Sequence, residues 1–327
     1  MVTYKITAGL ETYLNEWNRL IENSHTATVF QTPEYLLSWR ESFVSQKEVL
    51  LISIFEDLEV IGIAVFRKQA DKATLLGTDR IGLGGDLVTD FGDIIAKEGK
   101  EKEIWKEVLL ALGKNGIKEV VLDYIRQTSP SFTALTKLGH SHEEMLDNAI
   151  PDVSPSLDLP KTFNDYLNLL ERKNRHELQR KLRRLENTGY DIRVSAKATD
   201  ITEFIRLHKA STLTKDRFMN SEMVNFFTKI AKGLFSKGFI DLVFMEVEGK
   251  SVASTLSFLW KREYWLYNSG FDRNYKDLAV GLLLKGLTIK RAIDLGYNKY
   301  NFLRGNERYK YDLGAIDEKL YKIIIQF

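Results

Sequence analysis

Charged and phenolic side chains cluster directly after a short apolar segment near the end of the chain, in FLRGNERYKYDLGA (residues 302–315). Apolar and polar residues alternate from Tyr300 to Phe302, which predicts a short strand at that point. The polar residues that follow are Arg304, Glu307, Tyr309 and Lys310. Because unpaired charges are costly to bury, packing alone explains this cluster poorly. These groups could bind an anion, orient a substrate or transfer a proton, and the competing interpretation is a solvated turn held by ion pairs.

The length and composition of the chain limit its class. It has 327 residues, of which 44% are hydrophobic and 28% charged, values typical of a soluble protein with two domains. No apolar run approaches the roughly 20 residues that span a bilayer, and the N-terminus lacks the features of a signal peptide. Without cysteine, the chain has no disulfide, thiolate metal site or cysteine nucleophile. We therefore expect a cytoplasmic protein without membrane insertion.

The net charge of +2 hides an uneven distribution of charge. Residues 1–160 contain 16 Lys and Arg against 25 Asp and Glu, whereas residues 161–327 contain 31 against 20. The basic second half suggests an anionic ligand there, such as a phosphorylated cofactor, a nucleotide-linked sugar or RNA. A charge-complementary contact between the two halves explains the same asymmetry equally well.

The two halves of the chain repeat one order of elements. Three of the five prolines fall in AIPDVSPSLDLP near the midpoint, which marks a linker. Paired apolar segments predict a hairpin at residues 50–66 and its counterpart at residues 241–260. In each half a helix, a glycine and a strand then follow. This order predicts a tandem duplication, with domains at residues 1–155 and 156–327.

The second half also predicts a third strand at residues 265–271 and a strand after the last long helix at residues 300–303. Hairpin, strand, helix and strand in this order predict an α+β fold, in which helices flank a mixed, mostly antiparallel sheet. This order, together with RGNERYK (304–310), resembles the CelD/BcsL-type acetyltransferases, relatives of the FemAB aminoacyltransferases within the GNAT superfamily. The resemblance implies a tandem duplicated GNAT fold and an acyltransferase activity.

The resemblance implies an acyl-CoA donor, acetyl-CoA in the simplest case. In GNAT enzymes the pyrophosphate of coenzyme A meets the start of a helix, where unpaired N–H groups and the helix dipole favour an anion. The corresponding residues here are Arg273, Lys276, Ala279, Val280, Gly281 and Leu282. A packing role is the alternative for Gly281. The equivalent residues 96–103 of the first half carry three carboxylates, so we expect a degenerate first domain.

The resemblance also implies roles for the polar cluster. Backbone N–H groups of the third strand would polarise the thioester carbonyl, and Tyr309 or Tyr311 would protonate the departing thiolate. Lys310 resembles the lysine of the closing FK or YK motif of FemAB relatives, a cation near phosphate or a developing oxyanion. Arg304 and Glu307 would orient the acceptor or each other. Surface ion pairing is the alternative for each of these residues.

Two further candidates lie outside this cluster. Asp90–Asp93 resembles a Ser-Asp-Tyr-Xaa-Asp segment of the same relatives, in which Asp90 would bind the acceptor amine and Asp93 would act as base. Turn-forming aspartates explain the segment equally well. His208 lies where relatives often carry a histidine, and its ordinary pKa suits a base, although a helix-surface histidine explains it too. The remaining histidines suggest no third metal ligand, so we expect no metal.

A predicted helix at residues 168–187 carries seven basic residues between Arg172 and Arg184 against one glutamate. One interpretation is an arm that binds a polyphosphate acceptor or RNA, and the other is a solvated face packed against the acidic first domain. No motif supports sequence-specific recognition of nucleic acid, although binding of tRNA remains open.

These features predict direct acyl transfer from acyl-CoA to an amine of a sugar, nucleotide-linked sugar or amino-acid derivative, in cell-envelope or polysaccharide synthesis. One alternative is a FemAB-like ligase that uses aminoacyl-tRNA to extend a peptidoglycan precursor. Another is a non-catalytic component of polysaccharide assembly. The sequence leaves the acceptor, the acyl chain and the oligomeric state open.

Overall fold

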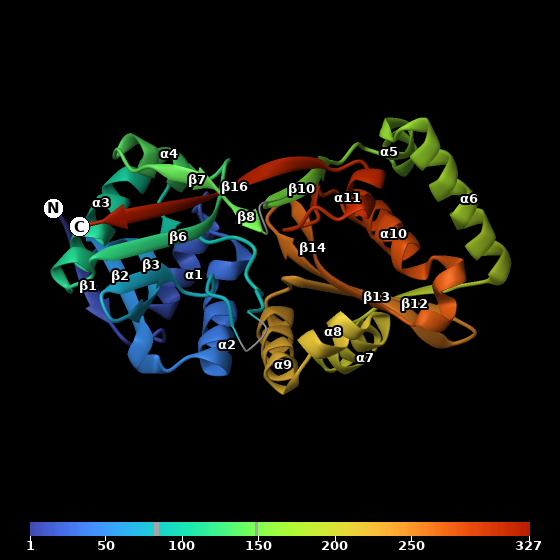
Figure 1. Ribbon diagram of the computed structural model, residues 1–327, viewed down its shortest axis with the longest axis horizontal. Helices are drawn as coiled ribbons and strands as arrows, with labels where there is room; N and C mark the ends of the chain where they lie inside the picture. The colour runs from blue at the N-terminus through green and yellow to red at the C-terminus, as the bar shows by residue number, and fades with distance from the viewer. Residues whose placement is uncertain (82–84, 148–149) are drawn as a thin grey trace. The chain divides into compact units, whose positions relative to one another are not determined.

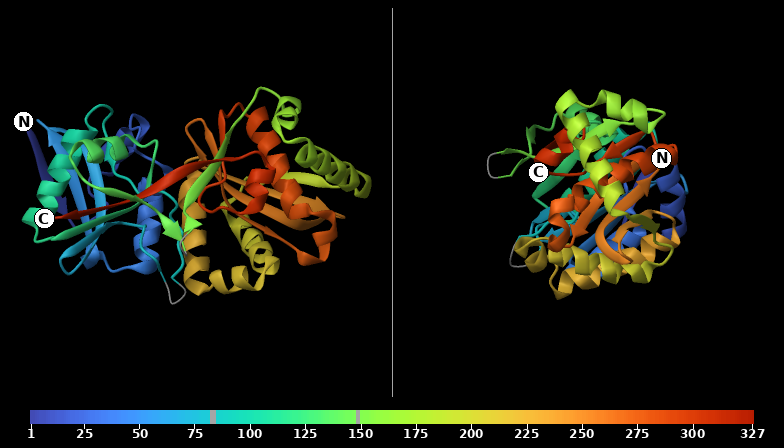
Figure 2. Two further views of the ribbon diagram at one scale, coloured as in Figure 1. Left: turned by 45° about the horizontal axis from the view of Figure 1, so that its top comes forward. Right: turned by 90° about the vertical axis from the view of Figure 1, so that its right-hand side faces the viewer.

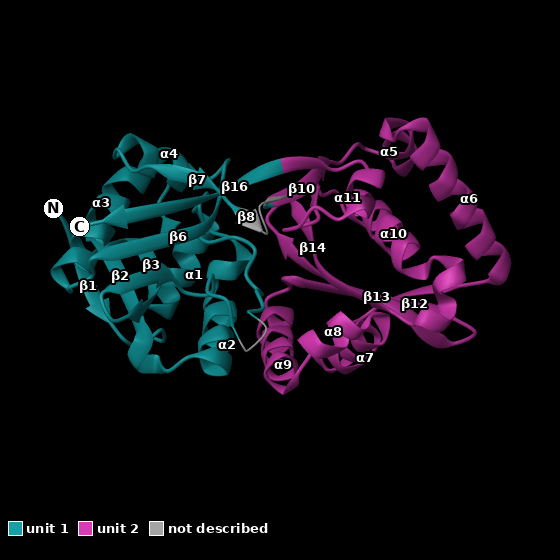
Figure 3. Cartoon of the chain, viewed as in Figure 1, with its two compact units in different colours: residues 1–152, 318–327 teal, residues 153–317 magenta. Residues whose placement is uncertain are grey.

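The computed structural model describes residues 1–81, 85–147 and 150–327, and the chain divides into two compact units (Figure 3). Unit 1 comprises residues 1–152 and 318–327, and unit 2 comprises residues 153–317. Residues 318–327, which the sequence prediction includes in the second domain, belong to unit 1. The reason is that the last strand, β16 (Ile316–Gln326), pairs with β6 (Glu119–Arg126) of that unit.

Unit 1 contains a mixed sheet with the strand order β1-β2-β3-β4-β6-β16. Its other main strands are β1 (Val2–Thr7), β2 (Val49–Glu56), β3 (Glu59–Gln69) and β4 (Lys72–Leu75). The short strands are β5 (Ile95–Ala96), β7 (His142–Glu144), β8 (Leu146–Asp147) and β9 (Ile150–Pro151). The helices are α1 (Leu14–Glu22), α2 (Pro33–Phe43), α3 (Glu101–Lys114) and α4 (Pro130–Lys137). Helix α3 packs its apolar side on β1–β3, where Ile104 and Trp105 are fully buried.

Unit 2 contains a second mixed sheet, with the strand order β10-β15-β14-β13-β12-β11. The strands are β10 (Val153–Asp158), β11 (Asp191–Val194), β12 (Ile240–Val247), β13 (Lys250–Trp260), β14 (Glu263–Phe271) and β15 (Lys299–Asn301). The helices are α5 (Phe163–Leu169), α6 (Arg172–Thr188), α7 (Ile201–Ser211), α8 (Leu213–Phe218), α9 (Ser221–Ser236), α10 (Val280–Asp294) and α11 (Arg308–Asp312). Helix α10 covers one face of β12–β14, and α7 and α9 pack against the opposite face (Figures 1 and 2).

The two sheets correspond strand by strand. In unit 1, β4 pairs with β6 in parallel, and in unit 2, β14 pairs with β15 in parallel. The other neighbours in both sheets are antiparallel, as in the hairpins β2–β3 and β12–β13. Beyond the parallel pair, each sheet continues with an antiparallel strand, β16 in unit 1 and β10 in unit 2. The predicted duplicated α+β fold is therefore confirmed.

The helix predicted at residues 168–187 is in fact two helices, α5 and α6. Leu170 and Glu171 between them have extended backbone, with ψ of 146° and 141°. The break lets Leu170 enter the core of unit 2, where it is 5% exposed, while α6 buries only Leu178 and Leu185 among its own residues. No helix in the described ranges combines the length and apolar character needed to span a bilayer.

Candidate functional site

In unit 2 the strands β14 and β15 run together over only part of their length. Their parallel pairing joins Glu263–Trp265 to Lys299–Asn301, whereas β14 continues to Phe271. A β-bulge also interrupts the pairing of β13 with β14, between Leu256 and Ser257 of β13. Bulges bend a strand and change the direction of its side chains. The later part of β14 therefore has a side along which a ligand can lie.

Helix α10 begins close to the end of β14. A 3₁₀ turn over Arg273–Leu278 connects the two elements, and Asp272 caps it by accepting a hydrogen bond from the Asn274 N–H at 2.9 Å. Ala279 then adopts a left-handed backbone, with φ of 54°, and offers no side chain to cap α10. The first-turn N–H groups of a helix without a side-chain cap are the groups that bind phosphate in other proteins.

A pocket of about 260 Å³ lies at this helix start. Its lining consists of Phe271, Lys276, Ala279, Val280, Gly281, Leu282, Lys285 and Tyr309. The structure thus brings together all the predicted donor-binding residues except Arg273, and adds Tyr309 to them. Arg273 instead donates from Nε to the carbonyl of Ser211 on α7, at 2.9 Å.

Gly281 has a packing role as well as a place in the pocket. A Cβ atom at this position would lie 2.9 Å from Cδ1 of Phe271, the last residue of β14. A side chain here would therefore displace the Phe271 ring or α10. Both interpretations of Gly281, close approach of a ligand and close packing of a helix, are compatible with its position.

Lys285 lies one turn after Gly281 and was not among the predicted site residues. Its Nζ donates to the Gly281 carbonyl at 3.1 Å and lies 4.7 Å from the centre of the Tyr309 ring. Burial and the nearby Lys215 and Lys310 ammonium groups lower the pKa of Lys285 to about 7, although Glu307 acts in the opposite direction. The spacing of four residues from Gly281 is the signal that could have found it, because it places both residues on one helix face.

Lys215 on α8 is a second buried lysine of this region. Its Nζ donates to the Ser269 carbonyl on β14. Burial lowers the pKa of Lys215 to about 8, with the Glu307 carboxylate acting against this shift. Two lysines with lowered pKa values therefore flank the later part of β14 and the start of α10.

Lys310 is 1% exposed and holds the loop that follows β15. Its Nζ donates to the carbonyls of Leu303, Arg304 and Gly305 at 3.0, 2.8 and 2.9 Å, and pairs with Glu307 at 2.9 Å. Burial acts to raise the pKa of Glu307, but the Lys310 and Arg304 charges keep it below its ordinary value. The Lys310 ammonium thus has four partners from its own loop, which indicates a structural role for this lysine.

The two tyrosines proposed as proton donors have different surroundings. Tyr309 lines the pocket, and burial raises the pKa of its phenol, so the phenol stays protonated. Tyr311 donates to Asp317 at 2.8 Å, and burial together with this bond raises its pKa to about 12. Of the two, Tyr309 is the phenol that reaches the pocket.

His208 is 2% exposed on α7, where this helix packs closely on β14. A Cβ atom at Gly270 of β14 would lie 2.3 Å from the His208 backbone nitrogen. Burial and the Lys215 charge lower the pKa of His208 to about 3, despite a hydrogen bond with Asn268. The imidazole is therefore neutral and a weak base at neutral pH, and the structure favours a packing role over the predicted catalytic one.

Asp90 and Asp93 lie in unit 1, whereas the other predicted site residues lie in unit 2. Asp93 is buried and accepts hydrogen bonds from the hydroxyls of Ser129 and Ser131, both at 2.5 Å, and from the Ile94 N–H at 2.7 Å. Burial raises its pKa to about 7. Since Ser129 also caps α4, Asp93 fastens the start of that helix, and Asp90 is partly exposed.

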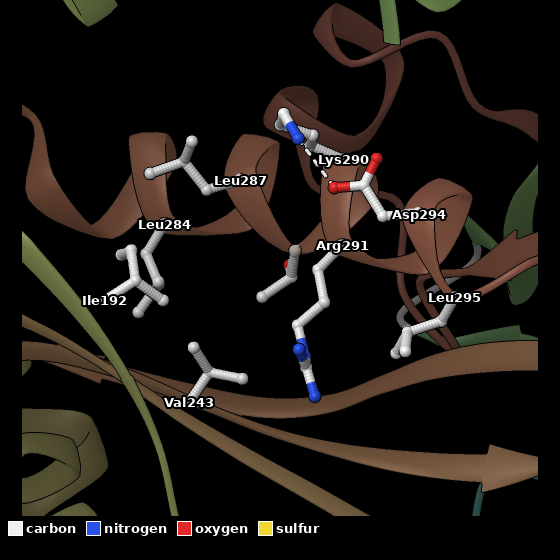
Figure 4. A pocket seen from close by; sticks show the side chains of 9 residues that line it. Ile192, Val243, Leu284, Leu287, Lys290, Arg291, Asp294 and Leu295 are labelled. Atoms are coloured by element: carbon white, nitrogen blue, oxygen red, sulfur yellow. Dashed lines mark hydrogen bonds and ion pairs between the residues drawn. The ribbon is translucent and has the colours of Figure 1, made fainter. Parts of the chain in front are cut away.

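Further along α10 a second pocket, of about 230 Å³, opens between this helix and β11 and β12 (Figure 4). Ile192 and Val243 face Leu284 across it, and Arg291 extends toward β12 (Figure 4). There Asp241 accepts hydrogen bonds from Arg291 at 2.7 and 3.1 Å. The described residues that line this pocket include none of the residues that the sequence predicts for the site. Nor do three His, Asp or Glu side chains gather as metal ligands anywhere in the described part of the chain.

Comparison with known proteins agrees with this geometry. Residues 172–311 match the family model described as acetyltransferase (GNAT) domain. No curated protein matches the chain. Among solved structures, FemX aligns with a TM-score of 0.71 at 13% identity, covering 99% of this chain and 97% of FemX. A conserved protein of unknown function from Bacteroides thetaiotaomicron aligns with a TM-score of 0.60 at 14% identity, covering 99% of this chain and 100% of that one.

A tandem GNAT protein from the clavulanic acid biosynthesis pathway aligns with a TM-score of 0.51 at 10% identity, covering 100% of this chain and 98% of that one. At such identities these structures are evidence for the fold, and the family match covers the α6–α11 region that contains the pocket. Residues 172–311 of unit 2 are therefore similar to a GNAT acetyltransferase domain, and the whole chain has the tandem GNAT fold.

Proposed function

We propose that this chain is an N-acyltransferase of the CelD/BcsL type. It would move an acyl group, acetyl in the simplest case, from acyl-CoA to an amine of a sugar, nucleotide-linked sugar or amino-acid derivative. The observation that carries the proposal is the pocket at the start of α10, which collects Lys276 and residues 279–282 within the GNAT domain. We also propose that the enzyme acts in cell-envelope or polysaccharide synthesis.

The donor would be held by the backbone of residues 280–282 and by charge. N–H groups at the start of α10 would face the pyrophosphate of the donor, and the exposed Lys276 would add a positive charge at the rim. The corresponding helix of unit 1, α3, begins differently. Its first turn contains Glu101 and Glu103, and Glu101 already accepts from the Gly99 N–H at 3.1 Å. One donor site per chain, in unit 2, follows from this contrast.

Acyl transfer needs three things from the protein in this arrangement. The thioester carbonyl needs hydrogen-bond donors, a role that we assign to the backbone of β14 beyond its pairing with β15. The departing thiolate needs a proton, which the Tyr309 phenol beside the pocket can supply. The acceptor needs orientation, which we assign to Arg304 and Glu307 of the loop that Lys310 holds.

A second function has one observation in its favour. Helix α6 carries basic side chains of which several, including Arg172, Lys173, Arg183 and Arg184, are exposed. This surface suits a polyanion, as expected for a FemAB-like ligase that takes its donor from aminoacyl-tRNA. This function would be favoured over the first if the protein bound tRNA with an affinity that falls steeply with salt concentration and did not bind coenzyme A.

The proposed function is tested by a thermal-shift titration with coenzyme A and acetyl-CoA. Ligand at about 100 times its dissociation constant should stabilise the folded protein by roughly 2.7 kcal/mol. Lys276→Glu should abolish the shift, because it places a carboxylate at the pocket rim, whereas Lys232→Glu makes the same charge change at an exposed site on α9 and should preserve it. Substituting Gly281 would be a poor control, since it would disturb Phe271. Absence of any shift at millimolar ligand would leave the tRNA-dependent or the non-catalytic function.

A further inference from the structure

Lys285 is a basic side chain held inside the candidate donor pocket. Its Nζ lies 4.7 Å from the centre of the Tyr309 ring and donates to the Gly281 carbonyl at 3.1 Å. The hydrogen bond turns the side chain back toward the start of α10, and both contact residues line the same pocket. Lys285 therefore lies between the groups proposed to bind the donor and the phenol proposed to protonate the leaving thiolate.

Charged and titratable groups surround Lys285 from each element that packs around the pocket. Lys215 lies on α8, Glu307 on the loop after β15, and Tyr309 and Lys310 on α11, while Lys276 lines the same pocket from the turn before α10. The lysines oppose a positive charge on Lys285, and Glu307 favours one. Because Glu307 already pairs with Lys310 at 2.9 Å, the net effect of the neighbours is to favour the neutral amine.

We infer that Lys285 is the residue that accepts the proton of the acceptor amine during acyl transfer. This inference rests on the proposed function. It concerns the part of the reaction that the donor-binding residues leave unassigned, namely where the proton goes when the amine becomes an amide.

Each bond and each proton of the acyl transfer can be accounted for. The acceptor nitrogen forms a bond to the acyl carbon, and the neutral Lys285 amine takes the proton that this nitrogen loses. The carbon–sulfur bond breaks, and the thiolate takes a proton from the Tyr309 phenol. The Lys285 ammonium then gives its proton to solvent water, and the Tyr309 phenolate takes a proton from solvent water, so that the enzyme ends in its starting state.

The other basic groups of the region are less suited to this task. His208 has its pKa lowered to about 3 and is buried in the α7–β14 contact, and the Lys310 ammonium is bound by three carbonyls and a carboxylate. Lys285 has a pKa of about 7, close to the value at which a general base works best at neutral pH. Lys215 has a pKa of about 8 and is bound to the Ser269 carbonyl, outside the pocket lining.

The first test measures the amine itself. The full chain is labelled with a trace of acetic anhydride at a series of pH values, and modification of Lys285 is followed by peptide mass spectrometry. We expect half-maximal reactivity near pH 7 and protection of Lys285 by coenzyme A. A midpoint near that of an ordinary lysine, or reactivity that coenzyme A leaves unchanged, would overturn the inference.

The second test measures the reaction. Thiol release from acetyl-CoA is recorded against pH, with aniline, an amine that is unprotonated throughout this pH range, as the probe and with water alone. In the wild type the rate of thiol release should rise with pH, and this rising limb of the profile should have its midpoint near pH 7. Lys285→Met should lack the limb and be about 100-fold slower at pH 8. Lys285→Arg should behave in the same way, because arginine keeps the positive charge but does not lose its proton in this pH range. Lys276→Met, the control, should raise KM for acetyl-CoA and keep the limb.

The two tests separate the inference from the function on which it rests. If coenzyme A binds the wild type and Lys285→Met equally, and the variant keeps the limb and a rate within threefold of wild type, only the role of Lys285 is wrong. If coenzyme A does not bind the wild type at all, the proposed donor site is wrong and the inference falls with it.

Discussion

Lys285 and Lys310 carry the same ammonium group in the same part of unit 2, and their partners give them different properties. Lys310 has three carbonyls and the Glu307 carboxylate within hydrogen-bond distance, which is the set of partners that a buried positive charge needs. Lys285 has one carbonyl and an aromatic face. The partners of Lys310 therefore compensate its buried positive charge, whereas burial and the nearby lysines lower the pKa of Lys285.

The structural role of Lys310 predicts a large effect on stability. Lys310→Met should lower the free energy of unfolding of unit 2 by about 3 kcal/mol, because it leaves three carbonyls and a carboxylate without their cation. Lys290→Met is the matched control. It breaks an exposed pair with Asp294 on α10 and should cost less than about 0.5 kcal/mol. Urea unfolding measures both, and a Lys310→Met protein as stable as wild type but inactive would instead favour the catalytic role.

The low pKa of His208 predicts a dependence of stability on pH. The unfolded chain takes up a proton at an imidazole pKa of about 6.5, whereas the folded protein does so only near 3. The unfolded state thus binds more protons in between, and stability is lost as the pH falls below 6.5. From pH 7 to 5 the wild type should lose about 2 kcal/mol more than His208→Gln. Equal losses, or a His208 ring resonance that titrates above pH 5, would contradict a buried neutral ring.

At the scale of elements, the connection from β14 to α10 depends on a backbone that suits glycine better than alanine. Ala279 has φ of 54°, and the following helix starts directly after it. Non-glycine residues pay about 1–2 kcal/mol in this left-handed region. Ala279→Gly should therefore stabilise unit 2 by up to about 1 kcal/mol, and Ala279→Val should destabilise it because a β-branched side chain fits this region worst. Thermal unfolding measures both, and shifts of the same sign would contradict the assigned conformation.

Alternation and turn residues are sufficient to predict the elements that build the site. The hairpin β12–β13, the strand β14 and the short β15 all carry patterns that depend on neighbouring residues only. The break between α5 and α6 is not predictable in this way, since it depends on the packing of Leu170 in the core of unit 2. The same limit applies to the burial of Lys215 and Lys285, which arises from packing of α8 and α10 beside the last loop. The roles of His208 and Asp93 likewise depend on contacts with residues distant in sequence.

At the scale of the whole chain, the sheet of unit 1 is completed by a strand that follows unit 2 in the sequence. Strand β16 follows unit 2 in sequence but pairs with β6 of unit 1, and β10 precedes the helices of unit 2 and pairs with β15. The end of the chain therefore contributes to the fold of unit 1. A domain boundary drawn at the proline-rich midpoint misses this. The prolines mark the passage from unit 1 to unit 2 near residue 152, but no change in composition marks the passage back to unit 1 near residue 318.

This arrangement predicts that a substitution at the end of the chain damages the beginning. Ile323 of β16 is fully buried and Ile324, its neighbour, is 38% exposed, so their side chains point to opposite faces of the strand. Ile323→Asp should remove protection from hydrogen exchange in residues 1–147, while peptides from residues 160–310 keep theirs. Ile324→Asp should leave both sets near wild type. Loss of protection confined to unit 2 would contradict the assignment of β16.

The central claim is that unit 2 binds an acyl-CoA donor at the start of α10, and hydrogen exchange with and without coenzyme A tests it most directly. We expect coenzyme A to slow exchange in peptides that cover residues 271–285, to leave α3 of unit 1 unchanged, and to lose its effect in Lys276→Glu but not in Lys232→Glu. Protection of α3 instead of residues 271–285, or no protection anywhere at millimolar coenzyme A, would contradict the claim.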